Sequence, residues 1–169
     1  MKKLITSILA IALMYSASAQ ISVGINGGMV SPTAEGSESH IGFNIFAKYN
    51  LSEKMRLGVN FGNYSKSYDL MGIDVKSIIS PITATFEYSF STNSFSPYAG
   101  IDAGIYQMGA SLGGVTVKES YLGLAPVVGA DYNLSDKLAI NANFKYHYIM
   151  SEGEATSAIG INAGVCYKF

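Results

Sequence analysis

The strongest constraint in this sequence is an alternation of apolar and small polar residues that runs from position 20 to position 169. Near the end of the chain, apolar residues occupy every odd position from 159 to 169. Successive side chains of a β-strand point to opposite faces, so a period of two predicts strands rather than helices. Eight such segments occur, at positions 21–29, 41–49, 56–62, 82–88, 95–105, 122–132, 138–148 and 159–169. The sequence therefore predicts an all-β fold with eight strands.

The charged residues of these segments indicate which face meets which environment. All seven share the parity of the small polar residues: Lys48, Arg56, Glu87, Asp102, Asp131, Lys145 and Lys168. The water-facing parity of a soluble sheet is dense in lysine and glutamate, whereas this parity is mostly glycine, asparagine, serine and threonine. Such residues suit a narrow interior, which leaves the apolar parity facing lipid. We therefore predict an eight-stranded, antiparallel, up-and-down transmembrane β-barrel.

The amino-acid composition agrees with this inside-out arrangement. Charged residues make up 14% of the chain, against about 25% in an ordinary soluble domain. A low charge fraction is expected when half of each strand faces hydrocarbon. A soluble, secreted β-barrel that binds a ligand inside is the alternative that this pattern leaves open.

The first nineteen residues differ from the rest and predict a secretory signal peptide. Lys2 and Lys3 precede an apolar run, and small residues follow at positions 17–19. The run is far shorter than the ~20 residues that a membrane-spanning helix needs. We expect cleavage between Ala19 and Gln20, which leaves residues 20–169 as the barrel domain.

A short motif marks the ends of successive predicted hairpins. Residues 49–55 read YNLSEKM, and residues 132–138 read YNLSDKL. Four tyrosines end the even-numbered segments on the lipid-facing parity and predict an aromatic girdle at one membrane interface: Tyr49, Tyr88, Tyr132 and Tyr167. Longer loops are expected at the opposite rim, at positions 30–39, 64–74, 109–118 and 150–157. Tyr64 and Tyr68 are expected there as an upper girdle or an adhesive surface.

With these motifs the chain resembles the small outer-membrane β-barrels of the OmpA/OmpX-like, "porin family" type. The resemblance rests on the signal sequence, the YNLS turns and the aromatic final strand, and it covers residues 20–169. It implies a place in the outer membrane of a Gram-negative cell envelope, reached through the periplasm. It also implies insertion by the barrel-assembly machinery, which in this class reads a final strand ending in an aromatic residue, here Tyr167 and Phe169.

The predicted interior suggests a closed barrel. An eight-stranded lumen is just wide enough for side chains to fill. Four cations and three carboxylates nearly balance there, as expected of buried charges that pair with one another. We therefore expect a polar, charged plug and a structural or surface-interaction role. The many glycines of the same parity free space, so a narrow porin-like channel for small solutes is the alternative.

Composition and motifs argue against several other functions. A net charge of −1 gives no basic footprint for nucleic acid, and one cysteine cannot build a disulfide framework. His147 is close to Ser151, but their spacing matches no recognised lipid-deacylase motif, so we expect no enzyme, no cofactor and no metal site. The expected partners are outer-membrane lipid, the assembly machinery and an extracellular ligand that the sequence does not identify. The barrel is expected to be a monomer.

Overall fold

A computed structural model describes residues 20–70, 73–112, 115–151 and 155–169 of the chain. The predicted signal peptide at positions 1–19 lies outside these residues. No helix in the described part of the chain has the length and apolar character needed to cross a membrane.

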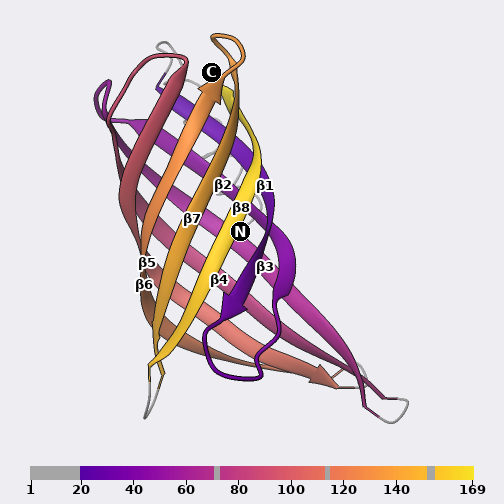
Figure 1. Ribbon diagram of the computed structural model, residues 1–169. Helices are drawn as coiled ribbons and strands as arrows, with labels where there is room; N and C mark the ends of the chain where they lie inside the picture. The colour runs from indigo at the N-terminus through magenta and orange to yellow at the C-terminus, as the bar shows by residue number, and fades with distance from the viewer. Residues whose placement is uncertain (1–19, 71–72, 113–114, 152–154) are drawn as a thin grey trace, which may run out of the picture.

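The described residues form eight antiparallel strands that close into a barrel in sequence order (Figure 1). Each strand pairs with its neighbours along the chain, and β1 closes the barrel by pairing with β8. The bounds are β1 Ile21–Pro32, β2 His40–Asn50, β3 Met55–Leu70, β4 Ile73–Ser89, β5 Phe95–Leu112, β6 Val115–Asn133, β7 Leu138–Met150 and β8 Thr156–Lys168. The predicted eight-stranded, up-and-down architecture is confirmed.

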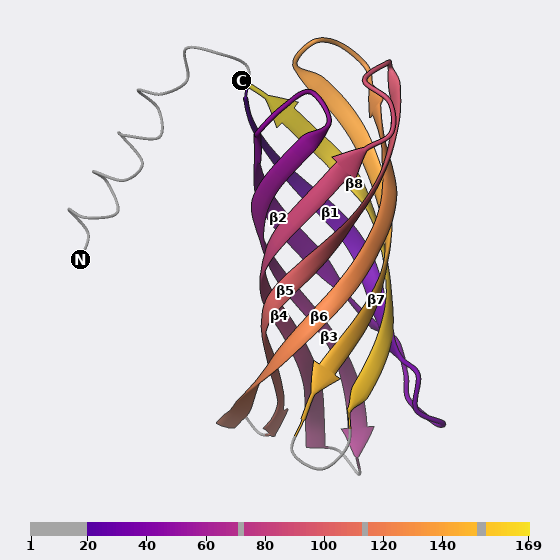
Figure 2. The ribbon, with the colours of Figure 1, turned by 90° about the vertical axis from the view of Figure 1, so that its left-hand side faces the viewer.

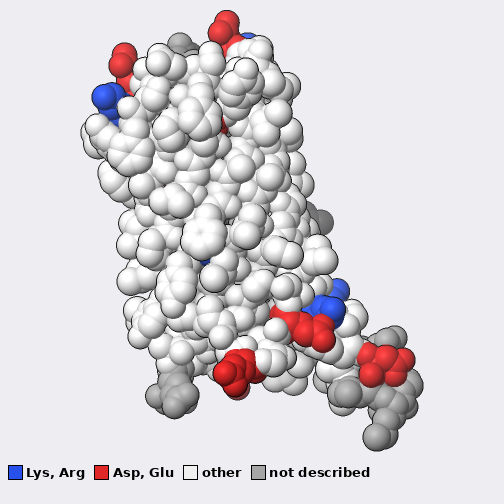
Figure 3. All heavy atoms as spheres, viewed as in Figure 1, with Lys and Arg blue, Asp and Glu red and all other residues white. Residues whose placement is uncertain are grey.

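The two faces of the strands differ as the alternation predicts. Val59 on β3 is 60% exposed, whereas its neighbour Asn60 is 7% exposed because it points into the barrel. Figure 3 shows charged side chains gathered at the two ends of the molecule, with an uncharged wall between them. The apolar band on the outside and the polar interior are the arrangement that a barrel in a bilayer requires.

The repeated turn motif builds the same local structure twice. Ser52 Oγ accepts hydrogen bonds from the backbone N–H of Lys54 and Met55, at 3.3 and 3.1 Å. Ser135 Oγ accepts from the N–H of Lys137 and Leu138 at the same distances. A serine hydroxyl that satisfies backbone donors in this way favours a tight turn. The first described residues and the C-terminus lie at this rim too, because Phe169 N–H donates to the carbonyl of Ile21 at 3.0 Å (Figure 2).

The prediction of loops at positions 64–74 and 109–118 is wrong, because these segments are mostly strand. The β3–β4 ladder continues to the pair Leu70↔Ile73, and the β5–β6 ladder continues to Leu112↔Val115. The apolar alternation fails here because these residues lie beyond the lipid-facing band. A better signal was Gly113-Gly114, a dipeptide typical of two-residue hairpin turns. The loop expected at 150–157 lies partly outside the described residues.

The long strands β3 to β6 therefore project from the barrel as a four-stranded sheet, called the extension below (Figure 1). It comprises residues 63–70, 73–80, 107–112 and 115–120. The outer wall changes from apolar to polar where the extension begins. The last apolar row across the four strands, as the register gives it, is Phe61, Ile82, Ile105 and Leu122. The next residues of the same parity are Asn63, Ser80, Gln107 and Ser120, and Ser80 is buried beneath Asn63, whose amide donates to its hydroxyl at 3.1 Å. This change marks the outer edge of the lipid-facing band.

A charge on the lipid-facing wall tests the assignment of faces. We expect Val59→Arg, near the middle of the band, to lower the free energy of unfolding by about 2–4 kcal/mol, since the guanidinium must enter hydrocarbon. Leu51→Arg, in the β2–β3 turn at the interface, should cost about 0–1 kcal/mol. Denaturant titration in lipid vesicles, read by the gel migration of unboiled samples, measures both. Equal losses would contradict the assignment.

Candidate functional site

The interior of the barrel holds a charged cluster near the turn rim. Lys48 Nζ lies 2.9 Å from Glu87 Oε1, and Arg56 Nη2 lies 2.9 Å from Glu87 Oε2. Arg56 also donates from Nη1 to Asp131 Oδ2. Arg56 is on β3 and Asp131 is on β6, which are not neighbouring strands, so this ion pair crosses the lumen. Lys48, Glu87 and Asp131 are almost fully buried.

Aromatic rings support the cations of this cluster. The Lys48 ammonium lies 4.6 Å from the centre of the Phe46 ring and 5.0 Å from that of Tyr98. The Arg56 guanidinium lies 4.8 Å from the Tyr98 ring. Cations within about 6 Å of a ring centre are attracted to its face, most strongly away from water. The cluster is therefore held by rings as well as by carboxylates, which fixes the cations in place.

Two glycines make room for the cluster. Lys48 on β2 reaches Glu87 on β4 by passing over β3 at Gly58, where an added Cβ would lie 2.9 Å from Lys48 Cγ. At Gly100 on β5, an added Cβ would lie 2.9 Å from Glu87 Cγ. A larger residue would collide with a backbone carbonyl, that of Ala47 at 2.5 Å or of Phe86 at 2.3 Å, and would also displace a charged side chain. These interior glycines thus belong to a packed lumen, and the space they leave is occupied.

A second ion pair lies further from the turn rim. Lys145 Nζ on β7 donates to Asp102 Oδ2 on β5 at 2.7 Å, across the intervening strand β6. Both side chains are buried, since 10% and 3% of their surfaces are exposed. Charges removed from water in this way are stable only when paired. Six of the seven predicted interior charges therefore meet in two ion-paired groups.

The seventh predicted charge behaves differently. Lys168 Nζ donates to the Asn133 side-chain oxygen at 2.6 Å and lies near the turn rim. A polar cavity of about 120 Å³ separates this rim from the charged cluster, and Lys168, Ser22 and Asp131 are among the residues that line it. This hollow reaches the cluster from the turn side.

Beyond the second ion pair, hydrogen-bonded rings fill the lumen. The Tyr106 hydroxyl lies 2.9 Å from His147 Nδ1, and the two rings pack edge to face. The Tyr64 hydroxyl donates to Asn162 Oδ1 at 2.6 Å, and the Asn162 amide donates to Asn143 at 3.2 Å. These bonds join β3, β5, β7 and β8. The interior is thus crossed at a third level.

Tyr64 and Tyr106 are two of the interior residues that sequence reasoning missed, and Val30, Ile79 and Ile149 are others. Tyr64 was expected at the outer rim, but it is 3% exposed inside the barrel. Both tyrosines continue the inward parity of their strands, after Asn60 and Gly62 on β3 and after Asp102 and Gly104 on β5. That parity was the available signal. It was obscured at Tyr64 because the segment was interpreted as a loop.

Some buried polar groups along one wall lack protein partners. Asn26 on β1 and Asn141 on β7 both lie beside Gly164 of β8 in the register. Neither polar atom of the Asn141 side chain has a hydrogen-bond partner among the described residues, and Asn26 Oδ1 has none there either. Buried amides normally have partners, so these groups need solvent to satisfy them. Unpartnered buried atoms also occur elsewhere in the lumen, among them Asp102 Oδ1 and His147 Nε2.

The structure places the four predicted girdle tyrosines on the outer wall near the turn rim. Tyr49, Tyr88, Tyr132 and Tyr167 are all roughly half exposed. Tyr88 packs edge to face on Phe90, and Tyr167 packs similarly on Phe169. Amphipathic rings at one level suit the boundary between lipid and water.

Comparisons with known proteins agree on the architecture. The family model of the outer membrane protein beta-barrel domain matches residues 5–169. An uncharacterized protein of Haemophilus influenzae is 26% identical over the full length of both chains. The crystal structure of Neisserial surface protein A has a TM-score of 0.72 at 24% identity, covering 88% of this chain and 97% of that one. Ail, the attachment invasion locus protein of Yersinia pestis, has a TM-score of 0.61 at 20% identity, covering 89% and 97%.

Removal of the cation that joins two carboxylates tests the cluster. We expect Arg56→Met to lower the free energy of unfolding by about 3–5 kcal/mol, because Glu87 and Asp131 then remain buried with too few cations. Lys168→Met is the matched control and should cost about 1 kcal/mol, the value of one hydrogen bond. Denaturant titration in vesicles compares the two. A loss at Arg56 no larger than that at Lys168 would show that the cluster adds little stability.

Proposed function

Because the chain belongs to the outer membrane protein beta-barrel domain family, we propose that it is a closed outer-membrane barrel that acts through its surface rather than its lumen. The observation that carries this proposal is the ion pair between Arg56 and Asp131, which crosses the lumen from β3 to β6. Glu87, Lys48 and the Tyr98 ring complete that level. A solute would have to displace a desolvated, multiply bonded cation to pass.

Two further levels support a closed lumen. The Lys145–Asp102 pair and the hydrogen bonds of Tyr106 and Tyr64 lie one beyond the other along the barrel. Each joins strands that are not neighbours. Side chains therefore connect opposite parts of the barrel wall at three positions along its axis, and the loss of one set of contacts leaves the other two in place. This arrangement favours a rigid scaffold that presents its extracellular parts.

The extension supplies the surface for such a role. It projects from the barrel beyond the lipid-facing band (Figure 1). We propose that it contacts a ligand outside the cell, that the barrel is a monomer without enzymatic activity, and that the assembly machinery reads Tyr167 and Phe169. Outer-membrane family membership disfavours the soluble alternative.

One observation favours the rival role of a narrow channel. The unsatisfied amides of Asn26 and Asn141 indicate a hydrated strip along β1, β8 and β7. Small solutes that follow such a strip would pass beside Asp131, which lies opposite Asn141 in the β6–β7 register. The charged cluster therefore predicts a lumen that does not conduct, whereas the hydrated strip predicts one that does.

Planar-bilayer recording tests the closed lumen. We expect no reproducible single-channel steps from the wild-type protein, because three side-chain levels block the path. The channel alternative predicts steps whose size or ion selectivity changes in Asn141→Asp, which adds a charge to the hydrated strip. Asp136→Asn, in the β6–β7 turn, is the control for a surface charge. Steps that respond to Asn141→Asp and not to Asp136→Asn would overturn the closed-lumen proposal.

A further inference from the structure

Apolar side chains fill the lumen at the end away from the turn rim. Val30 on β1, Tyr64 on β3, Ile79 on β4 and Ala158 on β8 form a buried cluster, called the outer plug below, and each is at most 3% exposed. The Tyr64 hydroxyl links this plug to the hydrogen bonds beneath it, through Asn162. The two ends of the lumen therefore differ, because the other end holds the polar cavity at the turn rim.

His40, the first residue of β2, lies beside the outer plug. In the β1–β2 register it is the partner of Val30, and it is 4% exposed. Its Nε2 lies 2.8 Å from Ser77 Oγ on β4. Because β3 separates β2 from β4, this contact crosses a whole strand, as the Lys48–Glu87 pair does nearer the turn rim.

The β1–β2 connection is held in place on both sides of His40. Thr33 N–H donates to the carbonyl of Ser157 at 2.9 Å, which ties the connection to the β8 side. Glu38 pairs with Lys66 on β3 at 2.7 Å. Both side chains of that pair are largely exposed, so it contributes little by itself. The buried contact of His40 carries the attachment further, to the second strand of the extension.

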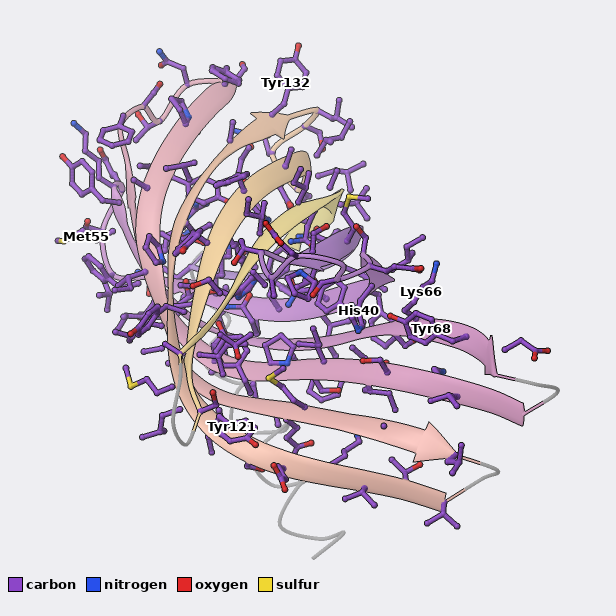
Figure 4. The ribbon with its side chains drawn as sticks, turned by 60° about the horizontal axis from the view of Figure 1, so that its bottom comes forward. His40, Met55, Lys66, Tyr68, Tyr121 and Tyr132 are labelled. Carbon is purple, nitrogen blue, oxygen red and sulfur yellow. The ribbon has the colours of Figure 1, made fainter. Side chains whose placement is uncertain are left out.

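The surroundings of the His40 ring suit an uncharged imidazole. Lys66 faces it from β3 and Ser77 from β4, while the residue opposite it on β1 is the apolar Val30. Figure 4 shows His40, Lys66 and Tyr68 together on this side of the molecule. Nδ1 of the ring has no hydrogen-bond partner among the described residues. A protonated ring would therefore place a buried N–H without an acceptor and a second positive charge near Lys66.

These surroundings make the contact sensitive to acid. Lys66 and Ser77 both belong to the extension, so the ring lies beyond the lipid-facing band. Burial lowers the pKa of His40 below its ordinary 6.5, the backbone of Glu38 partly opposes this shift, and the charge of Lys66 adds to it. The contact is thus fully stable above about pH 6.5 and loses stability as the pH falls below that value, because the released ring binds a proton more readily than the buried one.

We propose that His40 is an acid-sensitive latch, which holds the β1–β2 connection against β4 over the outer plug and releases it when the ring is protonated. Release uncovers the apolar cluster around Val30 and Tyr64. The inference goes beyond the proposed closed lumen, because the Arg56 cluster and the Lys145–Asp102 pair remain in place below the plug. The latch therefore alters the outer surface of the protein in acid without opening a path through it.

A thiol placed in the outer plug reports release of the latch. Val30→Cys is made in a Cys166→Ser background, and the full-length protein in lipid nanodiscs is labelled with 4,4′-dithiodipyridine. Thr116→Cys in the same background gives the rate for an exposed thiol at each pH. We expect the ratio of the two rates to rise by up to about thirtyfold from pH 7.5 to pH 5, the limit for one group with an ordinary pKa of 6.5.

Four variants separate the latch from other effects of acid. His40→Gln keeps a polar side chain opposite Ser77 that does not titrate, so the ratio should stay flat. His147→Gln changes the other histidine and should keep the rise. Lys66→Met should reduce the rise, because it removes the cation that opposes protonation of the ring. Lys76→Met, on the outer face of the same sheet, is its matched control and should leave the rise unchanged. Unboiled gel migration confirms that each variant folds.

Three results would overturn the proposal: a ratio that does not change with pH, a rise that persists in His40→Gln, or a rise that only His147→Gln abolishes. Bilayer recording on the same samples keeps this test separate from that of the closed lumen. Channel steps at both pH values would refute the closed lumen and leave the latch standing. A flat ratio without channel steps would refute the latch alone.

Discussion

The structure depends on one constraint, which is that every backbone N–H and C=O in hydrocarbon must find a partner within the protein. A β-sheet meets this requirement only when its edges disappear, and the pairing of β1 with β8 removes them. Closure of eight strands then fixes the width of the lumen, and the lumen width decides how the interior is filled. The alternation of the sequence follows from the same geometry, since each strand must show one face to lipid and the other to a crowded interior.

The interior illustrates how charge is accommodated where water is scarce. Lys48, Arg56, Glu87 and Asp131 lie on four different strands, yet they form one network because Gly58 and Gly100 let the long side chains pass. Such a network ties together parts of the wall that share no backbone hydrogen bonds. The amides of Asn26 and Asn141 lack such partners among the described residues, and they are the groups on which the conducting interpretation depends.

Beyond the lipid the same strands follow different rules. Between Phe61 and Asn63 the outer wall of β3 changes from apolar to polar, and the other three strands of the extension change at the same level. The inner face is apolar in its row of Tyr68, Val75, Leu112 and Val115, whereas Lys66, Ser77 and Glu119 lie nearer the barrel on the same face. Closure also ends in this region, because β2 pairs with β3 only as far as Ser65 and β7 pairs with β6 only as far as Leu122, so the edges that the membrane forbids reappear in water.

The sequence by itself determined the strand number, the antiparallel order, the face of the seven charged residues in the predicted segments and the turn rim, because a period of two is a local property that lipid enforces along each strand. It placed Arg56 and Asp131 on the inward parity but did not show that they meet. Their contact depends on which strands face one another across the closed barrel, and only the tertiary structure decides that. Nor did the sequence reveal the extension, because the alternation that identified the strands follows the membrane boundary, whereas backbone pairing continues past it to Leu112 and Val115. The open edge of β6 follows from that difference, since it exists only where β6 continues beyond the end of its ladder with β7.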